Sequence, residues 1–120
     1  MRLEALDRPD TYVTHTDAHV ALADPLRIET SQFRLRDGRG STSFEALDAP
    51  GLFLSVGADG VVFAGSSAAR FVRRPGLADP RGTSWQVAGA RRSFLMHDGD
   101  ALRVGVVGDR RATSATFFVR

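Results

Sequence analysis

Hydrophobic residues recur along this chain of 120 residues at a fixed spacing of 41. A shift of 41 residues in either direction carries Phe44 onto Leu3 and Trp85. Four further apolar positions keep this register in three copies: Phe53 with Tyr12 and Phe94, Leu54 with Val13 and Leu95, Val61 with Val20 and Leu102, and Phe63 with Leu22 and Val104. Such a period indicates a repeat architecture.

Each copy contains short alternating or β-branched segments separated by turn residues, a pattern typical of β-strands. In the first copy the pattern predicts strands over residues 3–6, 12–15, 20–22 and 33–36. Asp59-Gly60 in the second copy and the residues 97–100 in the third are hairpin signals, because these residue types accept tight turns. No stretch keeps a helical period. We therefore expect about twelve short strands.

The three copies cover residues 3–38, 42–80 and 83–120, and one copy alone cannot bury its own apolar positions. Three four-stranded units that share one core around a pseudo-threefold axis form a β-trefoil. Closure into a barrel also removes the exposed strand edges of an open sheet. A three-bladed propeller is the geometric alternative, but propellers usually have four or more blades. The sequence therefore predicts an all-β chain that forms a single β-trefoil domain over residues 1–120.

Composition excludes several classes of function. The chain has no cysteine, which excludes disulfides, thiol catalysis and thiolate metal sites. All sixteen basic residues are arginine, the formal net charge is only +2, and aspartates are interspersed among the arginines. Because a nucleic-acid binder usually concentrates basic charge on one face, we expect a solvated surface of mixed sign and no nucleic-acid partner.

The first repeat begins directly after Met1-Arg2, with no apolar signal core before it and no run long enough to span a membrane. The chain is either a whole cytoplasmic protein or a domain of a longer, secreted enzyme, and the sequence does not separate these alternatives. We expect a monomer without a membrane partner.

Several short sequence motifs are distinctive: Ser43-Phe44-Glu45, Pro50-Gly51, Arg74-Pro75-Gly76-Leu77, and Phe33-Arg34-Leu35-Arg36-Asp37-Gly38. With them the chain resembles, over nearly its whole length, the arabinose-binding domain of α-L-arabinofuranosidase B, which is carbohydrate-binding module family 42. The resemblance implies a β-trefoil, no cofactor, and binding of arabinofuranose side chains of hemicellulose, in a module carried by secreted glycoside hydrolases.

In that family each sugar pocket uses a histidine that ends the second strand and an aspartate that opens an Asp-Ala-Thr-Phe motif. The histidine positions of this chain hold His15, Val56 and His97, and the aspartate positions hold Thr30, Ala68 and Ser114. A carboxylate is a stronger acceptor for sugar hydroxyls than a neutral hydroxyl is. We therefore expect the second copy not to bind, and copies one and three to bind weakly, with Glu29 and Asp109 in the adjoining loops as further candidates.

Other chemistry finds little support. Glu4 and Glu45 could form the carboxylate pair of a glycosidase, but they share one repeat position, which holds Gln86 in the third copy. A catalytic pair needs two unlike environments, which repeat symmetry does not favour. His15 and His19 have a spacing that serves a metal on a helix, but they flank a predicted turn. We expect no catalytic and no metal site.

The aromatic residues mostly occupy repeated apolar positions, which predicts that they form the core and that any sugar site is a small polar pocket. Each copy also ends in Phe-x-x-Arg, and we expect the three arginines at equivalent places, bonded to carbonyls of the linkers between copies; they are Arg36, Arg74 and Arg120. Two functions remain open at this point. The first is a non-catalytic carbohydrate-binding module, and the second is a trefoil that has lost sugar binding and serves in packing or protein interaction.

Overall fold

The computed structural model describes residues 1–120 and contains twelve β-strands and three short 3-10 helices. The first six strands are β1 (Leu3–Ala5), β2 (Tyr12–Thr16), β3 (His19–Ala23), β4 (Phe33–Gly38), β5 (Ser41–Ala46) and β6 (Phe53–Val56). The last six strands are β7 (Val62–Gly65), β8 (Phe71–Pro75), β9 (Thr83–Val87), β10 (Ser93–Asp98), β11 (Ala101–Val106) and β12 (Phe117–Val119). The 3-10 helices are η1 (Ile28–Ser31), η2 (Asp109–Arg111) and η3 (Thr113–Ala115). The predicted strand number and the absence of a sustained helix are confirmed.

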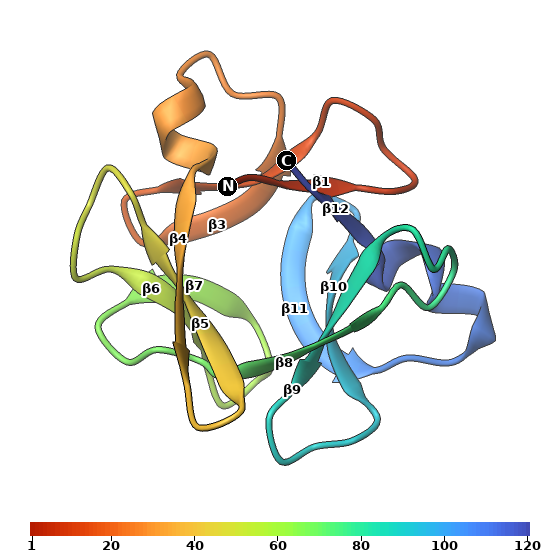
Figure 1. The fold of residues 1–120 in the computed structure, drawn as a ribbon. Helices are drawn as coiled ribbons and strands as arrows, with labels where there is room; N and C mark the ends of the chain where they lie inside the picture. The colour runs from red at the N-terminus through yellow and green to blue at the C-terminus, as the bar shows by residue number, and fades with distance from the viewer.

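Six strands close into a barrel. Antiparallel pairing runs from β1 through β12, β9, β8 and β5 to β4. The barrel closes between β4 and β1, where the backbone N–H of Phe33 donates to the carbonyl of Met1 at 2.8 Å. The two chain ends lie side by side (Figure 1), joined by paired backbone hydrogen bonds between Arg2 and Arg120 at 2.9 Å.

The other six strands form three hairpins, β2–β3, β6–β7 and β10–β11, which meet one another and cap one end of the barrel. His19 pairs with Phe63, Ala21 with Ala101, and Val61 with Arg103, so that every hairpin contacts the other two. Viewed as in Figure 1, the three copies surround one axis. Three four-stranded units with a shared barrel and a hairpin cap form a β-trefoil, as predicted.

The core sits inside the barrel and uses the repeated apolar positions. Leu3, Phe44 and Trp85, which share one repeat position, are all fully buried. The indole of Trp85 meets the ring of Phe44 edge-on, with centroids 4.8 Å apart and planes at 85°. Two other repeated aromatics, Tyr12 and Phe53, are only half-buried. The prediction that the repeated aromatics form the core therefore holds for Phe44 and Trp85 and fails in part for Tyr12 and Phe53.

One register prediction was wrong. In the second copy Val56 pairs with Val62 and Leu54 with Ala64. Five residues separate Val56 from Val62, whereas four separate the equivalent pairs His15 with Val20 and His97 with Leu102. A one-residue shift in a strand turns every side chain to the opposite face. Val62 is accordingly 2% exposed, whereas Val61 and Phe63 are exposed at 47% and 39%.

The arginines of the Phe-x-x-Arg sequences occupy equivalent surroundings, as predicted, but their partners differ from the prediction. Each guanidinium bonds a side chain at the Glu4 repeat position instead of a linker carbonyl. The pairs are Arg36 Nη1 with Glu45 Oε1 at 2.9 Å, Arg74 Nε with Gln86 Oε1 at 3.1 Å, and Arg120 Nε with Glu4 Oε1 at 2.9 Å. A forked donor and a planar acceptor side chain match in geometry, which explains the preference.

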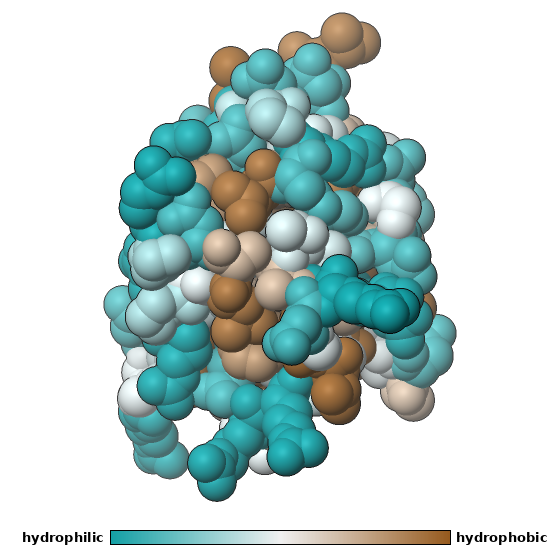
Figure 2. Space-filling view, turned by 90° about the vertical axis from the view of Figure 1, so that its right-hand side faces the viewer, coloured by the Kyte–Doolittle hydropathy of each residue, from teal (hydrophilic) through white to brown (hydrophobic).

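The surface is mainly hydrophilic. Figure 2 shows one side of the molecule, on which hydrophilic residues surround a narrow band of hydrophobic ones. Several large apolar side chains are exposed, among them Ile28 in η1 and Leu26 just before it. No helix of this structure has the length and apolar character needed to cross a membrane.

Candidate functional site

His15 lies near the end of β2, where the sequence predicted a sugar contact, and it is buried. Its Nε2 lies 2.6 Å from Oδ1 of Asp48, and its Nδ1 lies 3.3 Å from the carbonyl oxygen of Asp17 in the hairpin turn. Asp48 belongs to the turn between β5 and β6. The first copy therefore supplies the imidazole and the second copy supplies the carboxylate.

His97 on β10 repeats this arrangement. Its Nε2 lies 2.8 Å from Oδ1 of Asp7, and its Nδ1 lies 3.0 Å from the carbonyl oxygen of Gly99. Asp7 belongs to the turn between β1 and β2, so this pair joins the third copy to the first. Arg8 reinforces the same junction, because its Nη1 donates to the carbonyl of Gly99 at 3.1 Å.

The pairs follow one rule, in which the histidine of a copy meets the aspartate of the next copy around the axis. Asp7 and Asp48 are 41 residues apart, and the corresponding position of the third copy is Gly89. By the same rule Val56 corresponds to the histidine that would face Gly89. The third junction has therefore lost both partners together, which is the expected outcome if neither group has a use alone.

Sequence reasoning found the two histidines but missed the two aspartates. The sequence did carry a signal for these pairs: the one junction without an aspartate, at Gly89, is also the junction without a histidine, at Val56. The signal was hidden because the partners belong to different copies and are separated by 33 and 90 residues in the chain.

Each pair presents a defined set of polar atoms. Both ring nitrogens of His97 face oxygen atoms, one of the Asp7 carboxylate and one of a backbone carbonyl. The Oδ2 atoms of Asp7 and Asp48 receive no hydrogen bond from the protein. These side chains are 33% and 29% exposed, so each junction offers a partly solvated carboxylate oxygen held beside a buried ring.

The other predicted site residues lie next to these strands. Thr30 and Glu29 belong to η1, which packs beside β2, and Ser114 belongs to η3, which packs beside β10. The Thr30 hydroxyl donates to the carbonyl of Arg27 at 2.8 Å, and the Ser114 hydroxyl donates to that of Arg111 at 2.8 Å. These hydroxyls are thus engaged by their own helical turns, and neither is bonded to a histidine.

Two acidic candidates lie further out. Glu29 is exposed and lies 3.8 Å from the guanidinium of Arg27, while Asp109 is exposed at the start of η2. The second copy has no 3-10 helix at the corresponding place, and Ala68 lies there in a shorter connection. The second copy thus lacks the helical turn as well as the histidine.

The carboxylates of Glu4 and Glu45 serve the fold. Glu4 Oε2 accepts from the backbone N–H of Asp10 at 2.9 Å, and Glu45 Oε2 accepts from that of Gly51 at 3.0 Å. These backbone donors are the main cause that lowers the pKa of both carboxyls below the usual value, and the nearby arginines add to the effect. Two carboxylates in matching environments with lowered pKa values do not form an acid–base pair.

Neither histidine lines any of the three main cavities of the molecule.

No protein-family model matches this chain, and no curated protein matches it. Solved structures do. A GH54 α-L-arabinofuranosidase variant soaked with 4-nitrophenyl α-L-arabinofuranoside superposes with a TM-score of 0.83 and 18% identity, covering 98% of this chain and 30% of that chain. An arabinofuranosidase complexed with arabinofuranosyl-alpha-1,2-xylobiose superposes with a TM-score of 0.82 and 17% identity, again over 98% and 30% of the two chains.

A ricin B-like lectin of Macrolepiota procera in complex with lactose superposes with a TM-score of 0.79 and 9% identity, covering 97% of this chain and 90% of the lectin. This chain therefore spans less than a third of the arabinofuranosidases and nearly the whole of the lectin. At these identities the comparisons establish architecture. The chain has the β-trefoil fold that it shares with part of the arabinofuranosidases and with the ricin B-like lectin.

Proposed function

We propose that this chain is a non-catalytic carbohydrate-binding module that takes arabinofuranose side chains of hemicellulose at the two histidine–aspartate junctions. The observation that carries the proposal is the repeated pair, His15 with Asp48 and His97 with Asp7, each with one carboxylate oxygen free of protein donors. The aspartate of the family's Asp-Ala-Thr-Phe motif is absent from this chain, which has Thr30, Ala68 and Ser114 at those positions. In this proposal Asp48 and Asp7, each from a neighbouring copy, supply the carboxylates instead.

The chemistry suits a sugar. Two adjacent hydroxyls of a furanose ring can donate to the free carboxylate oxygen, and such charge-assisted bonds are stronger than bonds to a neutral acceptor. The imidazole holds the carboxylate in place from behind, so that little side-chain freedom is lost on binding. The small number of exposed aromatics favours a single terminal sugar unit over an extended polysaccharide face.

The comparisons support this proposal at the level of the fold. One similar structure holds an arabinofuranosyl-xylobiose and another holds lactose. Because this chain corresponds to 30% of the arabinofuranosidases, we propose that it acts as an accessory domain or descends from one. The carboxylates of Glu4 and Glu45, bonded to backbone and arginine, agree with a module that has no catalytic pair.

Calorimetric titration with arabinose and arabinoxylan oligosaccharides tests the proposal. We expect weak binding with a stoichiometry of two sites per chain. Asp48→Asn and Asp7→Asn should each remove one site, because an amide replaces a charged acceptor whose bonds contribute on the order of 1.5–3 kcal/mol, or about ten- to a hundredfold in affinity. The double variant should not bind.

Asp59→Asn is the matched control, because Asp59 lies in the hairpin turn of the second copy, which has no histidine. This variant should keep both sites. Thermal unfolding of every variant shows whether lost binding reflects lost folding. Wild-type protein that stays silent at millimolar ligand, or binding that survives in the double variant, contradicts the proposal.

A second candidate function is a protein-interaction module that has lost sugar binding. The observation that favours it is the outward pair Val61 and Phe63 on the β6–β7 hairpin, where neighbouring apolar side chains face solvent. A glycan array without signal, together with binding to an adjacent domain that Phe63→Ser abolishes, would favour this function over the first.

A further inference from the structure

A cavity of about 300 Å³ opens at the end of the barrel opposite the hairpin cap. The turn between β4 and β5 borders the cavity. Because β5 runs from this turn towards β6, which belongs to the cap, the turn lies at the end of the barrel away from the cap. The cavity is lined by Leu35, Asp37, Gly38, Gly40, Ser41, Thr42, Phe71, Arg73 and Trp85. It is separate from both histidine–aspartate junctions.

Strand alternation brings two opposite charges into this cavity. Residues two apart in a strand share a face, so Asp37 lies on the same face of β4 as the buried Phe33. Arg73 lies on the same face of β8 as the buried Phe71. Both charged side chains are exposed and lie at the open end of an inner face that is apolar deeper in the barrel.

The register places each charge beside a second polar group. Asp37 lies directly across from Thr42, and Arg73 directly across from Trp85. Such cross-strand neighbours have their side chains in contact distance. One wall of the cavity therefore holds a carboxylate and a hydroxyl, and the next wall holds a guanidinium and an indole N–H.

The repeat shows that these polar walls are exceptions. The positions equivalent to Arg73 in the other two copies hold Leu35 and Val119, which pack against the core. The pair equivalent to Arg73 and Trp85 is Leu3 with Val119, which is wholly apolar. Only one of three equivalent positions in the barrel mouth carries the guanidinium.

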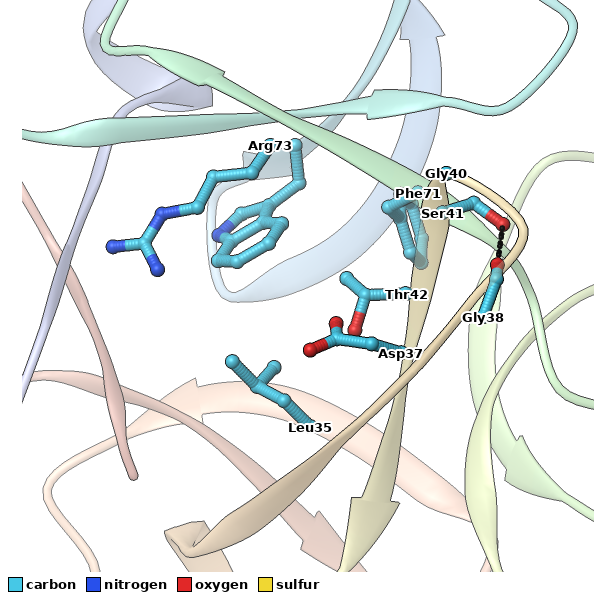
Figure 3. Close-up of a pocket in the computed structure, with 9 residues that line it drawn as sticks. Leu35, Asp37, Gly38, Gly40, Ser41, Thr42, Phe71 and Arg73 are labelled. Atoms are coloured by element: carbon cyan, nitrogen blue, oxygen red, sulfur yellow. Dashed lines mark hydrogen bonds between the residues drawn. The ribbon is translucent and has the colours of Figure 1, made fainter.

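These groups lack partners within the protein. Neither Asp37 nor Arg73 makes an ion pair or a side-chain hydrogen bond, with each other or with any other residue, and Figure 3 shows the Arg73 guanidinium extended away from the Asp37 carboxylate. Arg73 lies over the Trp85 ring, with its Cζ 5.5 Å from the centroid. Thr42 Oγ1 and Trp85 Nε1 are buried and have no hydrogen-bond partner.

Buried polar groups without partners are rare in native proteins and call for an explanation. By contrast, Arg36, Arg74 and Arg120 all have side-chain partners. Two buried polar atoms without partners, Thr42 Oγ1 and Trp85 Nε1, therefore line a cavity whose mouth carries the exposed and unpaired charges of Asp37 and Arg73, and this combination points to a ligand.

We propose that the barrel mouth binds a small zwitterion with an ammonium and a carboxylate at opposite ends. The ammonium would face Asp37 and Thr42, which can both accept, and the carboxylate would face Arg73 and the indole N–H of Trp85, which only donate. Leu35 and Phe71 would contact the aliphatic chain between the two charges. A simple anion would bring negative charge towards Asp37, and a simple cation would bring positive charge towards Arg73, so only a ligand with both charges complements the whole cavity.

The spacing of the two walls is tested with a series of ω-amino acids as a ruler: glycine, β-alanine, γ-aminobutyrate and 5-aminopentanoate. Trp85 is the only tryptophan of the chain, so its fluorescence reports directly on the cavity. We expect one member of the series to cause a saturable change with a millimolar Kd, and the members on either side of it to bind more weakly. Butyrate and butylamine should cause no saturable change over the same range.

Asp37→Asn and Arg73→Gln should each weaken binding of the preferred zwitterion at least tenfold. Arg34→Gln is the matched control, because Arg34 lies on the outward face of β4 and should leave the affinity unchanged. Asp7→Asn and Asp48→Asn should also leave it unchanged, which separates this site from the sugar sites.

Two results overturn the inference. One is the lack of any saturable change with every member of the series up to about 50 mM, roughly fifty times a millimolar Kd. The other is equal binding of butyrate and of the zwitterion, which would make the cavity an anion site. Chemical-shift mapping by NMR checks that a fluorescence change arises at the barrel mouth.

Discussion

The one-residue difference in the β6–β7 hairpin offers a sharp test of the structure. Simple repeat arithmetic places Val61 and Phe63 in the core, whereas the structure buries Val62 and exposes Phe63. The two registers therefore predict opposite orders for the loss of stability. The register from the repeat period makes Phe63→Ala the more destabilising substitution, and the register of the structure makes Val62→Ala the more destabilising one.

The magnitudes follow from burial. Val62 is 2% exposed, and its truncation removes two methyl groups from the core at about 0.8 kcal/mol each, with a cavity term in addition. We expect Val62→Ala to lower the free energy of unfolding by about 2–3 kcal/mol. The Phe63 ring is 39% exposed and lies against Gly65, so Phe63→Ala should cost about 1 kcal/mol or less despite the larger volume lost.

Urea unfolding followed by circular dichroism measures both values, and the midpoint should shift without a change in slope. For 120 residues, 2–3 kcal/mol corresponds to a fall in Tm of about 8–12 °C. Leu77→Ala serves as a control, because Leu77 is an exposed side chain outside the hairpin. A Phe63→Ala variant less stable than Val62→Ala would refute the register.

Three further predictions concern the core, the turns and the sugar sites. Trp85→Ala should cost roughly 3–5 kcal/mol in urea unfolding, because the side chain is fully buried, and a loss under about 1 kcal/mol would contradict its place in the core. The free energy of unfolding should fall as pH drops through and below 4.5, because Glu4 and Glu45 have lowered pKa values in the folded state and lose their bonds to donors on protonation. A Glu4→Gln, Glu45→Gln double variant should therefore show a smaller fall in Tm between pH 7 and pH 3 than the wild type. An equal fall would refute this cause. Ser114→Asp should raise arabinose affinity about ten- to a hundredfold at the third copy, because it adds a charged acceptor in the copy that has His97. Ala68→Asp should have no effect, because the second copy has Val56 in place of the histidine. Calorimetry that finds no difference between the two variants would show that this position does not face the sugar.

Much of the architecture was readable from the sequence. The period of 41 residues predicts three equivalent units, and the turn residues divide each unit into four strands. Leu3, Phe44 and Trp85 were predicted in the core and are fully buried there. The prediction succeeded because a core shared by three copies needs an apolar residue at the same position of each copy, and the sequence shows this need directly as a repeat.

The sequence did not determine the register of β7. The period predicted Val61 and Phe63 in the core, but an extra residue in the hairpin turn puts Val62 and Ala64 in their places. Turns tolerate insertions at little cost, while the alternation of a strand turns one added residue into an exchange of faces. Both registers have an apolar residue available, so the pattern alone cannot choose between them.

The candidate sites were decided by tertiary structure. The histidines His15 and His97 were visible as one repeat position, but their partners Asp48 and Asp7 lie in other copies. A period describes what each copy contains, whereas hydrogen bonds form across the junctions between copies. The polar cavity at the barrel mouth has the same origin, because its two walls come from different hairpins that only the pairing of β5 with β8 brings together.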